Sequence, residues 1–350
     1  MSDSDMTGLA HTVLGPVSPE SLGRTMTHEH LLIDFTCMFA PPSGAGERSR
    51  AYGPVTMENL GWITYDWRRH WENLLLSDVE TAIKEAELFR QLGGGTIVDA
   101  TTIGIGRDPI SIARIARATG LNVIMGAGYY VDAVHPDEMD DLSEADIARQ
   151  ISDEIRTGVG DTGVKAGVIG ELGCSWPLTA NERKVLRAAA AAQRDTGAPI
   201  LIHPGRHESA PREILDILSD AGGDVSRTVM GHLDRTIPDV ATLLDLAATG
   251  CYLEYDLFGW EVSYYPMSDI EMLNDAQRMG FIERLVAEGY GEKVLVAHDI
   301  CTKHRQVKYG GHGLGHILEN IAPRMLQRGM SHQDVDNILT ANPARLLAFA

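Results

Sequence analysis

The sequence lacks several features that would assign it to common protein classes. It contains no apolar run long enough to cross a membrane. Basic residues are scarce, because 30 lysines and arginines stand against 49 aspartates and glutamates, which gives a formal net charge of -19. Nucleic acids and anionic membranes normally require a basic surface. We therefore expect a small-molecule partner, with neither nucleic acid nor membrane.

Cysteine is also scarce. The four cysteines, Cys37, Cys174, Cys251 and Cys301, are widely scattered and show neither zinc-finger nor redox spacing. Free thiols of this kind are typical of a reducing compartment. Residues 1–5 are polar and acidic, unlike the basic start and apolar core of a secretory signal. A cytoplasmic location is the resulting expectation.

What the sequence does contain is a regular alternation of short apolar segments and helix-period segments. The first predicted strand ends near residue 30. The other seven cover residues 96–101, 122–128, 166–172, 199–203, 228–232, 251–257 and 293–299. The first helical pattern covers residues 77–92, before the second strand, where Ser77 and Glu80 suggest a capping box. Another helical pattern follows each of the later strands. Parallel strands joined by right-handed crossovers explain this order. An open doubly wound sheet is an alternative, but eight units without a linker favour a (β/α)8 TIM barrel, a single domain over residues 1–350.

One long segment interrupts the alternation. Residues 36–73 follow the first strand and contain prolines, glycines and five tryptophan or tyrosine residues, with no clear periodicity. Long loops inside compact domains are usually functional or disordered. Because aromatic side chains pack, we expect an irregular, lid-like loop that folds over the site.

Metal-ligand residue types lie at the ends of five predicted strands. In this barrel the active site is built at the carboxyl ends of the strands, so these residues should meet. They are His28 and His30 after the first strand, Glu171 after the fourth, His203 after the fifth, His232 after the sixth and Asp299 after the eighth.

The predicted order of the strands suggests how these residues are shared. His28 and His30 are separated by one residue and should point the same way on a strand; with Asp299 from the adjacent eighth strand they would hold one ion. His203 and His232 would hold the second, and Glu171 would bridge the two. Asp299 also suits a general base. Zinc is the expected metal, although such ligands also accept manganese, cobalt or iron.

At this point the chain resembles a known family. The matching stretches are residues 27–30 (THEH), 168–179 (VIGELGCSWPLT), 202–206 (IHPGR), 231–236 (GHLDRT), 252–259 (YLEYDLFG) and 295–299 (LVAHD). The chain is identified by them as similar to the phosphotriesterase-related proteins of the amidohydrolase superfamily. The resemblance extends from about residue 14 to the end, and it implies a binuclear zinc barrel with the ligands assigned above.

Two departures separate the sequence from the phosphotriesterases themselves. Those enzymes bridge their ions with a carboxylated lysine, where Glu171 stands here, and they carry a second acidic residue where Arg235 follows Asp234. The resemblance therefore implies a metal-bridged hydroxide that attacks the carbonyl of a small N-acyl amide, N-acetyltaurine-like or an N-acyl amino acid. A lactonase, aryl esterase or phosphotriesterase with the same site is the alternative.

Other functions are less consistent with this ligand set. A non-catalytic binding protein would be expected to have lost a ligand, and a mononuclear deaminase would not need Glu171 as a bridge. Barrels of this kind are frequently homodimers, which is the assembly we expect.

Candidate substrate contacts follow the same strand ends. The basic side chains could grip a carboxylate or sulfonate, since arginine binds such groups with two hydrogen bonds; ion pairs with Asp234 or other loop carboxylates are the alternative. The aromatic ones could form pocket walls or simply pack. The candidates are Arg206, Arg235, Lys303, His304, Tyr130 and Tyr255. His298 is expected to point away from Asp299 and to have a structural role.

Overall fold

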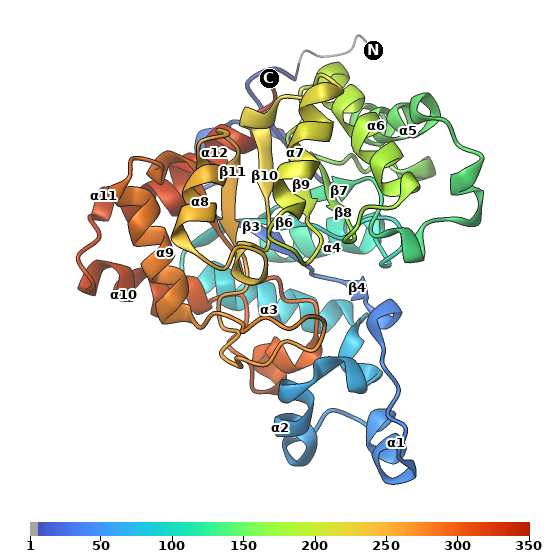
Figure 1. Ribbon diagram of the computed structural model, residues 1–350, viewed down its shortest axis with the longest axis vertical. Helices are drawn as coiled ribbons and strands as arrows, with labels where there is room; N and C mark the ends of the chain where they lie inside the picture. The colour runs from blue at the N-terminus through green and yellow to red at the C-terminus, as the bar shows by residue number, and fades with distance from the viewer. Residues whose placement is uncertain (1–5) are drawn as a thin grey trace.

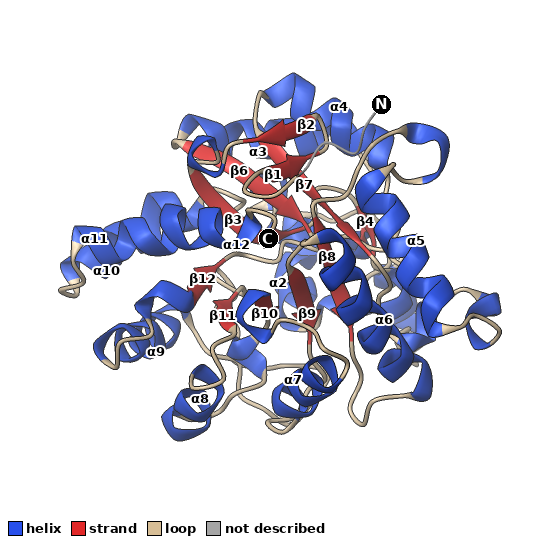
Figure 2. Cartoon of the chain, turned by 90° about the horizontal axis from the view of Figure 1, so that it is seen from above, coloured by secondary structure: helices blue, strands red, loops and turns tan. Residues whose placement is uncertain are grey.

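The computed structural model describes residues 6–350. Eight parallel strands form one curved sheet (Figures 1 and 2) in the order β12–β11–β10–β9–β8–β7–β6–β3. The strands are β3 (Arg24–Glu29), β6 (Gly94–Asp99), β7 (Asn122–Ala127), β8 (Val168–Gly173), β9 (Ile200–His203), β10 (Thr228–Met230), β11 (Tyr252–Tyr255) and β12 (Val294–Val296).

The two ends of this sheet meet and nearly close the barrel. The Thr27 hydroxyl donates to the Val296 carbonyl at 3.4 Å, and the Asp299 amide donates to the His28 carbonyl at 3.1 Å. These contacts join β3 to the end of β12, which is the neighbour relation that a (β/α)8 barrel requires. The predicted TIM barrel is confirmed.

Helices surround the barrel, as Figure 2 shows from above. Seven of them are α3 (Val79–Gln91), α4 (Pro109–Thr119), α5 (Glu144–Arg156), α6 (Ala180–Thr196), α7 (Ala210–Asp220), α8 (Val240–Ala247) and α9 (Asp275–Ala287). Capping boxes start α5, at Ser143 and Asp146, and α6, at Thr179 and Glu182. The predicted cap of α3 was wrong, because the side chain of Asp78, not that of Ser77, accepts from the Glu80 amide.

The final helices of the chain are interrupted by two π-helical segments. A π-helical segment, η13 (Ile317–Ile321), precedes α10 (Ala322–Gln327), and a second, η14 (Asn337–Ala341), separates α11 (His332–Asp336) from α12 (Asn342–Leu347). Along the described chain, no helix combines the length and apolarity needed to cross a membrane.

The interior of the barrel is filled by alternate strand residues. Val98, Ile124, Val168, Leu201, Val229 and Leu295, from six different strands, form one buried cluster with Leu346 and Leu347 of α12. The neighbouring residues of these strands face the helices in the main core. Two-residue alternation thus divides the apolar side chains between the two layers.

The two ends of the barrel are closed differently. The hairpin of β1 (Ala10–Thr12) and β2 (Gly15–Val17) lies with α12 at the amino end, where the Gly8 amide donates to the Phe349 carbonyl at 2.8 Å. The segment after β3 covers the carboxyl end and projects from the barrel in Figure 1. Its base is the antiparallel pair β4 (Ile33–Asp34) and β5 (Leu75–Leu76).

The expectation that residues 36–73 are irregular was wrong, since they contain α1 (Ala45–Ala51) and α2 (Met57–Tyr65). Both helices are short, so each offers too few turns for a recognisable apolar period. A side-chain cap starts α2, because Asn59 Oδ1 accepts from the Thr56 amide at 2.8 Å. We call residues 36–73 the lid.

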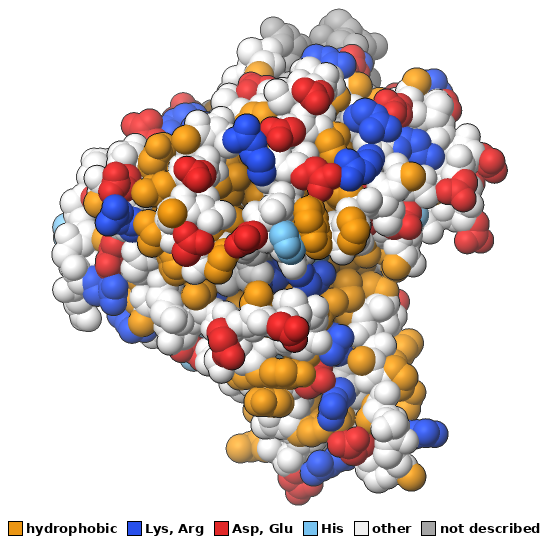
Figure 3. Space-filling view, viewed as in Figure 1, with side chains coloured by type: hydrophobic (Ala, Val, Ile, Leu, Met, Phe, Trp, Pro, Cys, Tyr) orange, Lys and Arg blue, Asp and Glu red, His pale blue; other side chains and the backbone are white. Residues whose placement is uncertain are grey.

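The aromatic side chains of the lid pack as expected. Trp67 stacks on Phe35 with ring centroids 5.5 Å apart, and Tyr65 stacks on Tyr264 of the β11–α9 loop at 4.7 Å. Hydrophobic side chains are visible where the lid joins the barrel in Figure 3. Tyr52 and Met57 of the lid are also exposed to solvent.

Candidate metal centre and active site

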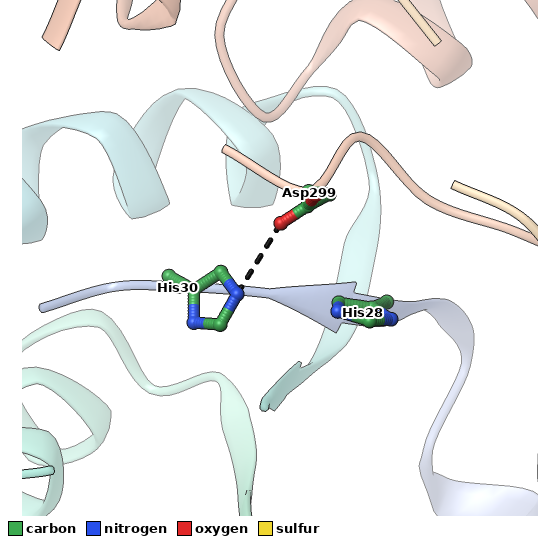
Figure 4. A group of neighbouring side chains, drawn as sticks. All are labelled: His28, His30 and Asp299. Carbon is green, nitrogen blue, oxygen red and sulfur yellow. Dashed lines mark ion pairs between the residues drawn. The ribbon is translucent and has the colours of Figure 1, made fainter. Parts of the chain in front are cut away.

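Two histidines at the end of the first barrel strand and one aspartate after the last form the first half of the site. In Figure 4, His30 points toward Asp299, and its Nε2 lies 3.2 Å from Asp299 Oδ1. His28 lies in β3, His30 directly follows that strand, and both side chains are buried. One atom from each of the three residues can be chosen so that all lie within 4.8 Å of one another.

Glu171, at the end of β8, connects this group to the second half. Its Oε1 lies 3.2 Å from His30 Nε2, and its Oε2 lies 2.9 Å from His203 Nδ1. His28 Nε2 and His232 Nε2 each lie 3.5 Å from Oε2. The carboxylate therefore faces all four imidazoles, as the predicted bridging position requires.

The arrangement of these atoms fits metal ions. His203 Nδ1 and His232 Nε2 lie 2.8 Å apart and both face Glu171, so two ring nitrogens converge on one carboxylate oxygen. His28 Nε2 is buried and has no hydrogen-bond partner among the described residues. Imidazoles and carboxylates that converge in this way are the ligand set of catalytic zinc and related divalent metals.

The backbone at two of the ligands is held in an unfavourable conformation. His232 has φ 52° and Asp299 has φ 50°, and they are the two non-glycine residues with positive φ in the described chain. For non-glycine residues this left-handed region costs free energy and is found mostly where function requires it. The strain therefore lies at the ends of β10 and β12, where the side chains must turn into the site.

The ionisable groups of the cluster shift one another's pKa values. Burial lowers the pKa of His203 well below its usual value, and the nearby charge of His232 lowers it further. Burial acts to raise the pKa of Glu171, but His28 and His203 outweigh burial and hold that pKa well below the ordinary range. At His28, His30 and His232 the neighbouring carboxylates outweigh burial and raise the pKa, to about 9 for His30. Because imidazoles bind metals in the neutral form, metal binding at these three histidines would release protons.

Glu254 and Asp256 were not identified as site residues from the sequence. Asp256 Oδ1 lies 2.8 Å from His232 Nδ1, and Asp256 Oδ2 accepts from the His232 amide at 2.8 Å. His28 Nδ1 lies 3.3 Å from Glu254 Oε2 and from Asp256 Oδ2. A carboxylate behind a ligating histidine fixes the tautomer and orientation of the ring.

The alternation along β11 was the available signal for these two residues. Glu254 and Asp256 lie two positions apart in a buried apolar strand, where an unpaired carboxylate would be costly. Burial raises the pKa of Glu254, whereas His232 and His28 outweigh burial and lower the pKa of Asp256. Asp256 is therefore the more readily ionised of the two.

His298 has the structural position expected for it. Its Nδ1 lies 2.6 Å from Glu29 Oε1, and its Nε2 accepts from the Ile317 amide at 3.0 Å. Glu29 also accepts from the His298 and Ile300 amides. The acidic residue between the two metal-ligand histidines thus positions the loop that carries Asp299.

A pocket with a cavity volume of about 30 Å³ opens above the metal-ligand cluster. Phe35, directly before the lid, and Trp67 of the lid line it together with Leu257, Trp260 and Tyr265 of the β11–α9 loop. Five of the six predicted metal ligands also line it; His28 lies deeper. The pocket is therefore small, largely aromatic and directly adjacent to the cluster.

Three of the candidate substrate contacts line this pocket and three do not. Tyr130, Arg206 and Arg235 are among its walls. Lys303 pairs instead with Glu72 of the lid at 2.7 Å, and the His304 amide donates to Asn73 Oδ1 at 2.9 Å. Tyr255 is buried against Phe281, with ring centroids 6.1 Å apart, because its position in β11 faces the surrounding helices.

Asp234 does not pair with either pocket arginine. Its Oδ1 accepts from Arg278 Nε, and its Oδ2 accepts from the Asp256 amide at 3.0 Å. Arg278 is fully buried in α9 and also donates to Asp275 and to the Trp260 carbonyl. Asp234 therefore holds the loop after β10 in place.

Comparison with family models gives a match to the phosphotriesterase family over residues 8–347. The chain belongs to this family. The resemblance to this family that the motifs around the metal-ligand residues indicate is thus confirmed over nearly the whole length of the chain.

Several relatives in the phosphotriesterase family are similar over their full length. The N-acetyltaurine hydrolases of Homo sapiens and Danio rerio are 49% and 48% identical to this chain, over 99% of both chains in each case. Among solved structures, a resiniferatoxin-binding protein from Rhodobacter sphaeroides is 34% identical with a TM-score of 0.94, and covers 97% of this chain and 95% of its own. A lactonase from Listeria monocytogenes is 25% identical with a TM-score of 0.77, covering 98% and 99%.

Proposed function

We propose that this member of the phosphotriesterase family is a hydrolase with two divalent metal ions, zinc in the first instance, that cleaves a small N-acyl amide of the N-acetyltaurine type. The observation that carries the proposal is the convergence of four buried histidines, Glu171 and Asp299 beneath one small pocket. The N-acetyltaurine hydrolases that are 48–49% identical support the amide as substrate.

His28, His30 and Asp299 would hold one ion, His203 and His232 the other, and Glu171 would contact both. When bound, two such ions lower the pKa of a water molecule and polarise the scissile bond. Asp256 and Glu254 keep His28 and His232 oriented, since both carboxylates lie within hydrogen-bonding range of the ring nitrogens opposite the site.

Asp299 acts as the general base and then as the general acid. Its Oδ1 is 3.2 Å from His30 Nε2, and its side chain is 13% exposed, so it faces both the cluster and the pocket. It takes the proton of the attacking water and passes it to the nitrogen of the leaving amine, which departs as a neutral amine. Phe35, Trp67 and Trp260 exclude bulk water from the reacting groups.

The proposal is tested with purified protein whose metal content has been measured. We expect about two divalent ions per chain, and a higher kcat/KM for N-acetyltaurine than for lactones, aryl esters or phosphotriesters. Asp299→Asn, purified in parallel, controls for contaminating hydrolases. One ion per chain would contradict the binuclear centre, and a preference for lactones or phosphotriesters would favour the alternative chemistry of the Listeria relative.

A further inference from the structure

Two arginines line the pocket without a carboxylate partner. Arg206 Nε donates to the Tyr265 hydroxyl at 2.7 Å, and Arg235 donates to the Pro204 carbonyl at 3.1 Å. Within residues 6–350, neither guanidinium takes part in an ion pair. Asp234, the nearest acidic residue in sequence to Arg235, is already bound to Arg278.

This arrangement is unfavourable for the protein alone. Arg235 is only 4% exposed, and Arg206 lies in the wall of the same pocket. Buried charges are normally paired, as Arg278 is with Asp234 and Arg107 with Glu154. Two adjacent unpaired guanidiniums therefore indicate a place for an anion.

Arg235 contacts the metal-ligand candidate His203, and this contact cannot be a hydrogen bond to His203 if His203 binds a metal ion through Nδ1. Arg235 Nη2 lies 3.1 Å from His203 Nε2, whereas His203 Nδ1 faces Glu171 and His232. A histidine that uses Nδ1 as a metal ligand carries its hydrogen on Nε2. Nε2 is then a donor, so the Nη2 group of Arg235 needs another acceptor, and the pocket is the space beside it.

The lid contributes one more unsatisfied donor to the same pocket. Trp67 is 4% exposed, and its indole N–H has no hydrogen-bond partner among the described residues. An indole N–H can only donate. Its position in the pocket wall adds a neutral donor to the two cationic groups.

We propose that Arg206 and Arg235 together bind an anionic end group, a sulfonate or carboxylate, on the amine half of the substrate. This inference rests on the proposed amide hydrolysis and names the feature of the substrate that the pocket selects. Arginine suits this role because its planar fork donates two parallel hydrogen bonds to such oxygens.

The distance between the two parts of the site limits the length of the substrate. His203 faces Glu171 with Nδ1 and Arg235 with Nε2, so a single imidazole ring separates the metal-ligand cluster from the arginine. The anion must therefore lie only a few bonds from the scissile carbonyl. An N-acyl amine with a two-carbon spacer, such as N-acetyltaurine or N-acetyl-β-alanine, meets this requirement.

The test compares anionic and neutral amides of the same size. We would measure kcat/KM for N-acetyltaurine, N-acetyl-β-alanine and uncharged N-propylacetamide with wild type, Arg206→Gln, Arg235→Gln and Arg235→Lys, after confirming equal metal content. Each Gln variant should reduce the preference for the anionic amides by about tenfold to hundredfold, because each removes a charged hydrogen-bond donor. Arg235→Lys should retain part of the preference, and the ranking of the two anions identifies the favoured end group.

A second measurement does not depend on hydrolysis. Ethanesulfonate carries the anion without an amide, and we expect it to raise the Tm of wild type but not that of Arg206→Gln. The matched control is Arg212→Gln on α7, which removes one positive charge from an exposed ion pair with Asp216. This control should keep both the preference and the Tm shift.

The outcomes separate the two proposals. If anionic and neutral amides lose activity equally in both Gln variants, the arginines have only structural roles and the anion subsite is overturned. If no amide is hydrolysed but ethanesulfonate stabilises wild type and not Arg206→Gln, the subsite stands and the proposed function fails. If amides are hydrolysed without preference for charge and ethanesulfonate has no effect on the Tm, the proposed function stands and the anion subsite fails.

Discussion

Arg278 offers the sharpest prediction about what stabilises the site. It is fully buried, and it joins three segments: Asp234 in the loop after β10, the Trp260 carbonyl in the β11–α9 loop, and Asp275 at the start of α9. Arg278→Met keeps most of the volume but removes all of these donors. The buried carboxylate of Asp234 then loses its cationic partner, and that of Asp275 keeps its contact with His316 Nε2 at 2.7 Å.

The expected cost follows from this geometry. Breaking a buried ion pair by removing one partner costs about 3–5 kcal/mol, because the remaining charge is left without compensation. For a chain of 350 residues the unfolding entropy is roughly 0.7 kcal/mol/K, so the Tm should fall by about 4–7 °C. Burial already raises the pKa of Asp234 against the opposing charge of Arg278, so loss of that charge should raise this pKa further.

The assay is thermal and urea unfolding of Arg278→Met, Asp234→Asn and the double variant. The two losses should overlap, so that the double variant is about 1–3 kcal/mol more stable than additivity predicts. Arg328→Met is the matched control, because Arg328 forms a surface ion pair with Glu283 of α9, the helix that also carries Arg278. It should cost less than about 1 kcal/mol. A loss for Arg278→Met no larger than that of the control, or additive single variants, would refute the reasoning.

Three further predictions concern turnover, metal affinity and pH. Asp299→Asn should keep the far-UV circular dichroism spectrum and lower kcat by about 10²–10⁴-fold; unchanged turnover rejects the general-base role. Asp256→Ala should weaken metal affinity by about 10–100-fold in chelator competition, because His232 loses the carboxylate that orients it; equal affinity would show that the carboxylate is dispensable. Burial lowers the pKa of His11 to about 4, so the folded state disfavours its protonation, and its contribution to stability is lost as the pH falls below about 6.5. His11→Phe should therefore reduce the loss of unfolding free energy between pH 7 and 5 by about 1–2 kcal/mol in urea titrations; identical losses in both proteins would contradict the low pKa.

Local patterns account for most of the agreement between sequence and structure. The one-residue spacing of His28 and His30 on a strand predicts a shared face, and the Nε2 atoms of both rings do face Glu171. The barrel follows because each strand and helix has its own apolar period and caps. The oligomeric state, the cytoplasmic location and the absence of a nucleic-acid partner stay predictions.

Contacts between residues far apart in the chain could not be predicted from local sequence patterns. The support that Asp256 gives to His232 depends on the register between β10 and β11. Asp234 binds Arg278, which is 44 positions away, so it does not pair with its neighbour Arg235. The helices of the lid were missed because they are too short for a recognisable apolar period, and α2 is held partly by the packing of Tyr65 against the distant Tyr264.

The hairpin and α12 at the amino end of the barrel have a practical consequence for engineering. Gly8 and Phe349 are hydrogen-bonded neighbours, and the lid lies at the opposite end of the molecule in Figure 1. A short glycine-rich linker between the two termini, with new ends opened in an exposed surface loop, should give a circular permutant with an unaltered pocket. Immobilisation through either terminus would likewise leave the mouth of the barrel directed away from the support.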